Sequence, residues 1–354
     1  MRTYILKRLL LMVPTLVGIT LLTYAIVRLA PGDPVGAMIR MQAGNVNPRV
    51  FEKEADRIRE RLGLKDYNFW GEDPERIDAV EKVLNAFYGY GRWVSHMARG
   101  DFGESMQKRT REGSKDPFDL YLERANVSVI LNLIAEALIF LIAIPVGLMG
   151  ARYHGRLFDR GSTVVLLGLW SVPQVLAGTL LLSLLARGGI GLEWFPYANL
   201  HGADPDAMGW GTWFVDTLWH ATLPVACLVY GGLAYLAKLG RASLLENLRA
   251  DYVRTARSKG LPESRVVYHH ALRNSLLPMI TTMVMMLPML LGGSVVVERI
   301  FSLPGMGDLI VGAAMQRDLA VIMFGTLVYG TLTLVSLLLA DILYAWADPR
   351  IRYD

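Results

Sequence analysis

The sequence is poor in charge: 19% of its 354 residues are Asp, Glu, Lys or Arg, while 53% are hydrophobic. Soluble domains usually carry about 25% charged residues. The deficit is uneven, because six stretches are almost free of charge. They are residues 9–27, 125–151 (interrupted by Glu136), 161–186, 217–237, 274–297 and 319–340. Each reaches the roughly 20 residues that an apolar helix needs to cross a bilayer. Because a chain in lipid must satisfy its backbone hydrogen bonds internally, we expect an all-α integral membrane protein with six transmembrane helices.

Cysteine and phosphate-binding loops are also scarce or missing. The single Cys227 excludes an internal disulfide and a thiolate metal cluster, so we expect a small apolar filler in the fourth run. No Gly-Lys dipeptide occurs, so the chain has no phosphate-binding loop of its own. We therefore expect no metal and no cofactor bound by this chain.

The six apolar stretches contain few features that two other classes of membrane protein require. A stand-alone secondary transporter or channel would need internal repeats or several buried charges, and the sequence offers no repeat and few such charges. A membrane enzyme such as an intramembrane protease would need a Ser/His or Asp/Asp pair within the runs, and we find none. The transporter or channel remains the alternative hypothesis.

The short connections indicate the orientation, because Lys and Arg concentrate on the cytoplasmic side of a membrane protein. Basic residues cluster at the amino terminus, after the second run, after the fourth run and in the tail, which share one side if there are six spans. Both termini are therefore expected to be cytoplasmic, and the sequence pI near 9.1 reflects this topology and indicates no nucleic-acid binding. The first run is longer than the 7–15 residues or so of a signal-peptide core, so we expect a retained span.

These patterns divide the chain into three parts. Residues 1–30 form an amino-terminal transmembrane helix, 31–124 an extracytoplasmic region, and 125–354 a core of five transmembrane helices. Within the second part, apolar residues at spacings of three and four predict helices over 51–62 and 75–88. The apolar residues of the second helix are Ile77, Val80, Val83, Leu84 and Phe87. Both helices are too polar to insert, so we expect them to pack on the outer surface or against a partner.

A polar, basic segment at 241–278 separates two apolar runs. Residues 241–259 contain no Pro or Gly, and Leu244, Leu248, Tyr252 and Ala256 recur at four-residue steps, which predicts one amphipathic helix. Gly260 ends it as a left-handed cap, and a second helix begins near Ser264. Two interpretations stay open on these grounds: an interfacial helix on anionic lipid, or a helix–turn–helix knob that docks on a protein.

Several phrases of the sequence carry a family resemblance. They are Ala30-Pro31-Gly32-Asp33-Pro34, Gly100-Asp101-Phe102-Gly103-Glu104-Ser105, Ile144-Pro145-Val146-Gly147, Ser171-Val172-Pro173, Tyr252-Val253-Arg254-Thr255-Ala256-Arg257-Ser258-Lys259-Gly260, Ala271-Leu272-Arg273-Asn274-Ser275-Leu276-Leu277-Pro278, Glu298-Arg299-Ile300-Phe301-Ser302-Leu303-Pro304-Gly305-Met306-Gly307 and Asp348-Pro349-Arg350-Ile351-Arg352. Together they resemble the B-type permease of ABC importers of the dipeptide/oligopeptide/nickel branch. Residues 219–224 and the long first external loop resemble the microcin C/peptide importer subgroup.

The resemblance implies a type I ABC-importer permease fold and a set of partners. These are a homologous C-type permease, two cytoplasmic ABC ATPase subunits, an extracytoplasmic solute-binding protein and the membrane lipid. The family's Glu-Ala-Ala pattern followed by Gly corresponds here to Arg254-Thr255-Ala256 and Gly260, with the Glu absent. The residues expected to couple to an ATPase are Asp251, Tyr252, Arg254, Thr255, Ala256, Arg257, Gly260 and Arg265.

The residues of the passage itself are less well marked. Glu136 lies within the second run, and an ionisable group inside a membrane is a functional candidate by default. It is equally well explained as a protonated or hydrogen-bonded group at a helix interface. Ser171, Pro173 and Gln174 interrupt the third run, where they line a passage or merely kink the helix and satisfy its freed backbone groups.

Overall fold

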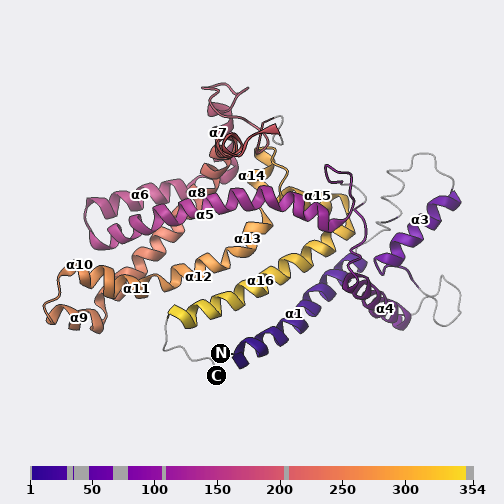
Figure 1. Cartoon of the computed structure of the whole chain (residues 1–354), viewed down its shortest axis with the longest axis horizontal. Helices are drawn as coiled ribbons and strands as arrows, with labels where there is room; N and C mark the ends of the chain where they lie inside the picture. Colours follow the sequence, from indigo (N-terminus) through magenta and orange to yellow (C-terminus); the bar gives the residue numbers. More distant parts are fainter. Residues whose placement is uncertain are drawn as a thin grey trace. The chain divides into compact units, whose positions relative to one another are not determined.

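The computed structural model describes residues 2–29, 35, 48–66, 79–105, 109–202 and 207–347. Within these ranges the regular structure is helical, apart from one isolated bridge between Ala186 and Phe195. The helices are α1 (Arg2–Leu29), α3 (Pro48–Arg61), α4 (Ala79–Ala98), α5 (Pro117–Arg152), α6 (Leu157–Ser171), α7 (Gln174–Leu185), α8 (Trp210–Arg249), α9 (Asp251–Ser258), α10 (Glu263–Arg265), η3 (Val266–Ala271, a π-helical turn), α11 (Leu272–Ser275), α12 (Leu277–Met285), α13 (Leu287–Gly292), α14 (Val295–Ile300), α15 (Met306–Gln316) and α16 (Leu319–Ala347) (Figure 1).

In the described ranges, four helices are long and apolar enough to cross a bilayer. They comprise Thr3–Arg28, Pro117–Arg152, Trp210–Arg249 and Leu319–Leu343. The third expected span is a bent pair, because α6 and α7 meet at 89°, which confirms the predicted interruption at Pro173. The fifth expected span is not one helix: α11, α12, α13 and α14 share it, with Pro278 and Pro288 in the first turns of α12 and α13. Proline there lacks the N–H that a continuous helix would need.

The chain divides into two compact units. One comprises residues 1–5, 125–308 and 332–354, and the other comprises 6–124 and 309–331. The first unit has its main core where α5, α7, α8 and α14 meet, around Leu131, Ile139, Leu236 and Phe301. Cys227 is fully buried in this core, as expected of a small apolar filler.

The second unit packs α3 and α4 against the carboxyl-terminal part of α1. Its core contains Tyr24, Ala55, Trp93 and Met323. Helix α3 confirms the predicted helix over 51–62. Helix α4 extends ten residues beyond the predicted end at residue 88, and residues 75–78 of that prediction lie outside the described ranges, as do the phrases at 30–34 and 348–352.

The orientation of α4 differs from that of an ordinary surface helix. Its residues Glu81 and Asn85 are 2% and 0% exposed, whereas Val80 and Phe87 on the predicted apolar side are 64% and 63% exposed. The apolar residues share one side, as expected, but that side faces away from the described protein.

Candidate functional site

The segment after α8 folds into a compact helical hairpin, which we call the coupling hairpin (residues 250–275). Figure 1 shows α9, α10 and α11 gathered at the end of α8. The hairpin has a small apolar core of its own, formed by Ala151, Leu244, Val253, Ala256, Val266 and Ala271, with Leu148, Leu245, Leu248 and Leu261 packed against it. This core holds α9 and η3 to the ends of α5 and α8, so the hairpin forms a firm extension of those helices.

The expected single helix over 241–259 is wrong. Helix α8 ends at Arg249, and Ala250 is extended, with φ −68° and ψ 150°. The break changes which side of α9 faces inward, so Val253 is buried and Tyr252 is 41% exposed. The Tyr252 hydroxyl donates a hydrogen bond to Asn247 Oδ1 at 2.6 Å. Tyr252 therefore belongs to the outer surface of the hairpin and not to the apolar face that its four-residue spacing predicts.

Gly260 forms the turn of the hairpin, as expected of a left-handed cap. Its φ is +75°, a conformation that residues with a side chain rarely adopt. The Leu261 N–H donates to the Ala256 carbonyl across the turn at 3.4 Å, and Leu261 packs on the hairpin core. No atom lies within 4 Å of the place where a Cβ on Gly260 would stand. The glycine is thus needed for its backbone, and the space beside it is open.

The outer surface of α9 carries most of the residues expected to couple to an ATPase. Exposed residues are Asp251, Tyr252, Arg254, Thr255 and Arg257, and Gly260 and Arg265 are exposed beyond the helix. Ala256 is the exception: it is 6% exposed and belongs to the core. It therefore affects the shape of the hairpin from within.

One ion pair closes the hairpin across its turn. Arg257 donates from Nε to Glu263 Oε2 at 3.1 Å and from Nη2 to Oε1 at 2.7 Å. This two-point hydrogen bond lowers the pKa of the Glu263 carboxyl below its usual value. Arg257 is thus already engaged within the chain. Arg254 pairs with Asp251 at 3.5 Å, and both of those side chains are largely exposed.

A second ion pair fixes the helices from which the hairpin extends. Arg241 on α8 donates from Nε to Asp159 Oδ1 at 2.6 Å and from Nη2 to Oδ2 at 2.8 Å. Asp159, at the start of α6, is 4% exposed. Nearby, a Cβ on Gly147 of α5 would stand 2.5 Å from the Ala237 carbonyl oxygen of α8. The sequence did not predict this ion pair. The one hint of close packing between α5 and α8 was Gly147, which lies in one of the family phrases.

The residues at the α6–α7 bend are tied to α8. Gln174 donates from Nε2 to the Cys227 carbonyl at 3.2 Å, and Tyr230 donates from its hydroxyl to the Val172 carbonyl at 3.1 Å. Pro173 and Ser171 are exposed, and the Ser171 hydroxyl bonds back to the Gly168 carbonyl. Gln174 and Tyr230 therefore satisfy backbone groups at the bend and between helices, which is the kink interpretation. Tyr230 was not foreseen.

Glu136 lies on a polar side of α5. Ser128, Asn132 and Glu136 follow at four-residue steps, so they share one side of the helix. Ser128 bonds to Glu298 at 2.8 Å, and Asn132 donates to the Leu290 carbonyl at 3.4 Å. One carboxyl oxygen of Glu136, Oε2, is buried and has no hydrogen-bond partner in the described part of the chain.

A buried carboxylate organises the end of the fifth expected span. Glu298 is 2% exposed and accepts hydrogen bonds from the Ser128 hydroxyl and from the N–H groups of Ser294 and Asp308, at 2.8, 3.1 and 2.9 Å. The Met306 N–H in turn donates to Ser128 Oγ at 2.8 Å. Sequence reasoning noted this phrase only as a resemblance, and missed that its acidic residue joins α5, α14 and the start of α15.

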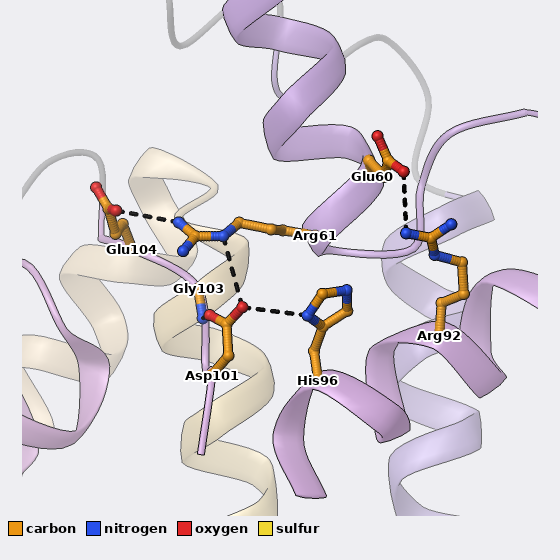
Figure 2. A network of polar contacts seen from close by, with 7 residues as sticks. All are labelled: Glu60, Arg61, Arg92, His96, Asp101, Gly103 and Glu104. Atoms are coloured by element: carbon orange, nitrogen blue, oxygen red, sulfur yellow. Dashed lines mark hydrogen bonds and ion pairs between the residues drawn. The ribbon is translucent and has the colours of Figure 1, made fainter. Parts of the chain in front are cut away.

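The second unit carries a partly exposed polar network, shown in Figure 2. Arg61 bonds to Glu104 at 3.0 Å and reaches Asp101 at 3.5 Å, and Asp101 also meets His96 at 3.1 Å. Arg92 pairs with Glu60 at 2.9 Å. A cavity of about 680 Å³ lies beside this network, and Lys115 and Asp116 contribute to its lining. The surface therefore offers both signs of charge to a partner.

Among the residues that the structure describes, no group of three or more His, Cys, Asp or Glu residues could hold a metal ion.

Comparison with known proteins gives one family and full-length relatives. The family described as "Binding-protein-dependent transport system inner membrane component" matches residues 143–353. The oligopeptide transport system permease protein AppB of Bacillus subtilis is 35% identical over the whole of both chains. The inner membrane ABC transporter permease protein YejB of Escherichia coli O157:H7 is also 35% identical over the whole of both. The dipeptide transport system permease protein DppB of Escherichia coli K12 is 33% identical over all of this chain and 99% of its own.

Proposed function

The chain belongs to the family of binding-protein-dependent transport system inner membrane components, and from this membership we propose that it is the permease subunit of an ATP-driven importer for peptides or peptide-like solutes. It is a multi-pass membrane protein that forms half of the passage. Relatives named as oligopeptide, dipeptide and di/tripeptide permeases support the substrate class. A stand-alone secondary transporter or channel is the alternative that the experiments below must exclude.

The proposed topology has six spans and both termini in the cytoplasm of a bacterial or archaeal cell. The three-part division at residues 30 and 124 is kept with it. A C-type permease supplies the other half of the passage, and two ABC ATPases supply the energy through ATP and Mg. A solute-binding protein delivers the substrate from outside. The polar network of Figure 2 and the charged side of α3 offer that protein a docking surface.

The observation that carries the proposal is the coupling hairpin. It has its own core, it is joined to α5 and α8, and its outer side presents Tyr252, Arg254, Thr255 and Arg265. Packed helices switch between discrete arrangements and do not stretch, so a hairpin of this kind transmits a push from a bound ATPase into the membrane. The open space beside Gly260 suits the close approach of a partner.

Glu136, Ser171, Pro173 and Gln174 are proposed to lie along the passage. Of these, Glu136 has a buried oxygen without a partner in the described structure, which supports a role toward a polar solute. Gln174 is already engaged with α8, so its contribution is to hold the bend.

Retention of the ATPases tests the docking role of the hairpin. Gly260→Trp should abolish copurification of the cognate ATPases with this chain, because the side chain fills the space beside the turn. Gly155→Trp is the matched control: Gly155 has φ +76°, open space around it, and a place in the turn between α5 and α6. Equal retention by the two variants, or normal peptide uptake with Gly260→Trp, would refute the docking role.

A further inference from the structure

Helix α4 has an exposed apolar side, and its buried side includes two polar residues besides Gly89 and Trp93. In the described structure Val80, Val83, Leu84, Phe87 and Val94 are 64%, 54%, 41%, 63% and 38% exposed. We call these residues the α4 apolar stripe. Glu81 and Asn85 point the other way and are buried. A helix at an aqueous surface instead places its charged and polar residues outward.

The neighbouring helix α3 shows that this reversal is specific to α4. Its inward side carries Ala55, which is fully buried. The exposed positions of α3 include Glu52, Lys53 and Arg57, all of them charged. Two adjacent helices of the same unit therefore present opposite chemistries, and water suits only the surface of α3.

The contacts of α4 with α1 set its depth in the membrane. The Tyr90 hydroxyl lies 2.8 Å from Thr20 Oγ1 and donates to the Val17 carbonyl at 3.2 Å. Thr20 precedes Arg28, the last residue of the apolar span of α1, by eight positions. At 1.5 Å per residue it lies about 12 Å inside that end. Tyr90 thus extends well into the zone that the apolar part of α1 occupies.

The backbone of α4 is also held close to the end of α1. Gly89 packs against Gly63, because a Cβ on either residue would stand 2.1 Å from the other's carbonyl oxygen. Gly63 accepts hydrogen bonds from Tyr24 and Arg28 of α1, at 2.6 and 3.3 Å. The middle of α4 therefore lies level with the last turn of α1, where hydrocarbon meets headgroups.

From this placement we propose that α4 is a membrane-interface helix whose apolar stripe contacts the acyl chains of the leaflet at the carboxyl end of α1. Amphipathic helices of this kind bury their apolar face about 5–10 Å into the boundary between headgroups and acyl chains. The stripe consists of aliphatic residues and one Phe, and Tyr88 beside it is 46% exposed. A Tyr at the edge of an apolar stripe suits a membrane interface, where aromatic rings with a polar end are enriched. The exposed Lys82 beside it can extend its ammonium group toward lipid phosphates.

The proposal makes the expectation for this helix more specific: it lies on the membrane surface with its apolar stripe in the acyl chains. That expectation counted the polar residues of the sequence without knowing that the protein itself covers them. The proposal depends on the proposed six-span topology only for the identity of the leaflet, which would be the outer one.

Spin labels on single cysteines test the proposal. The full-length chain, with Cys227→Ala, receives Phe87→Cys or Val83→Cys on the stripe, or Lys53→Cys on the charged side of α3, and is placed in phospholipid nanodiscs. Oxygen dissolves in lipid and a nickel chelate dissolves in water. We expect the ratio of oxygen to nickel accessibility to be several-fold higher at positions 83 and 87 than at 53.

The same measurement is repeated on the chain copurified with its partner subunits. Accessibility to the nickel chelate at 83 and 87 equal to that at 53 would place the stripe in water. Exclusion of both reagents from 83 and 87 would assign the stripe to a protein contact. Either result overturns the proposal. Because permease coupling is not measured, failure of the proposed function would leave this test unaffected.

Discussion

At the residue scale, three glycines leave room for one buried carboxylate. A Cβ on Gly293 or Gly305 would stand 2.2 or 2.4 Å from an atom of the Glu298 carboxyl group, and one on Gly307 would stand 3.0 Å from it. Real Cβ atoms essentially never approach as closely as those on Gly293 or Gly305 would, so alanine at either position would force the carboxylate away from its donors. A buried carboxylate that loses hydrogen-bond donors costs more than the bonds themselves contribute.

We therefore predict that Gly305→Ala destabilises the chain by about 1–3 kcal/mol, the usual range for overpacking. The measurement is the midpoint of thermal unfolding of the purified chain in detergent. Gly168→Ala is the control, because Gly168 lies within α6 and nothing surrounds its Cβ position. The control should unfold at or above the wild-type midpoint, since alanine favours helix. A midpoint for Gly305→Ala as high as that of the control would contradict the steric argument.

Sequence could identify Glu298 and Gly305 as parts of one phrase but could not assign their task. Ser128, Gly293 and Gly305 meet around Glu298 only after α5, α13 and α15 have packed. The glycine at 260 was easier to assign, because a helix that ends at Gly before Pro is a local pattern. Its positive φ follows from neighbours in the chain and not from distant contacts.

At the element scale, the coupling hairpin shows where helix periodicity fails as a guide. Ala250 is a good helix former, so nothing in its own preferences predicts the break between α8 and α9. The small core of the hairpin overrides that local preference, which is weak compared with burial. The same limit applies to α4. Its sequence predicted that the apolar residues share one side of the helix, but the contacts with α1 were needed to infer that this side faces lipid.

The Arg257–Glu263 pair gives a prediction for this element. The pKa of Glu263 is lowered by the hydrogen bond from Arg257. Its contribution to stability is therefore present above the unfolded pKa of about 4.3 and is lost as pH falls through the folded pKa. Both side chains are partly exposed, 41% and 62%, so we expect the pair to contribute less than about 1 kcal/mol. Its main effect is on the geometry of the turn.

Charge reversal separates that geometric role from direct contact with an ATPase. Arg257→Glu should reduce ATPase retention because two carboxylates then face each other, and combining it with Glu263→Arg should restore retention. Arg254→Glu, on the exposed outer surface, should reduce retention with no rescue by Glu263→Arg. If the double variant retains the ATPases no better than Arg257→Glu alone, Arg257 contacts the ATPase itself, as the family resemblance implies.

At the scale of the whole molecule, the chain offers a route through the membrane without a source of energy. It has no phosphate-binding loop, and in the described structure the Asp159–Arg241 pair holds α6 to α8 at the base of the coupling hairpin. A device of this kind can pass on a movement that begins in another subunit. It follows that the chain should be inactive alone, which distinguishes a permease subunit from a secondary transporter.

Uptake of a labelled peptide into proteoliposomes measures this difference. The chain by itself should show no uptake under an imposed proton or sodium gradient, because the proposed energy source is ATP hydrolysis in separate subunits. Reconstitution with the second permease, both ATPases and the binding protein should give uptake that requires ATP. Replacing the phosphate-loop lysine of the ATPases should return uptake to background while the assembly stays intact. Gradient-driven uptake by the chain alone would favour the secondary transporter, and the coupling hairpin would then need another explanation.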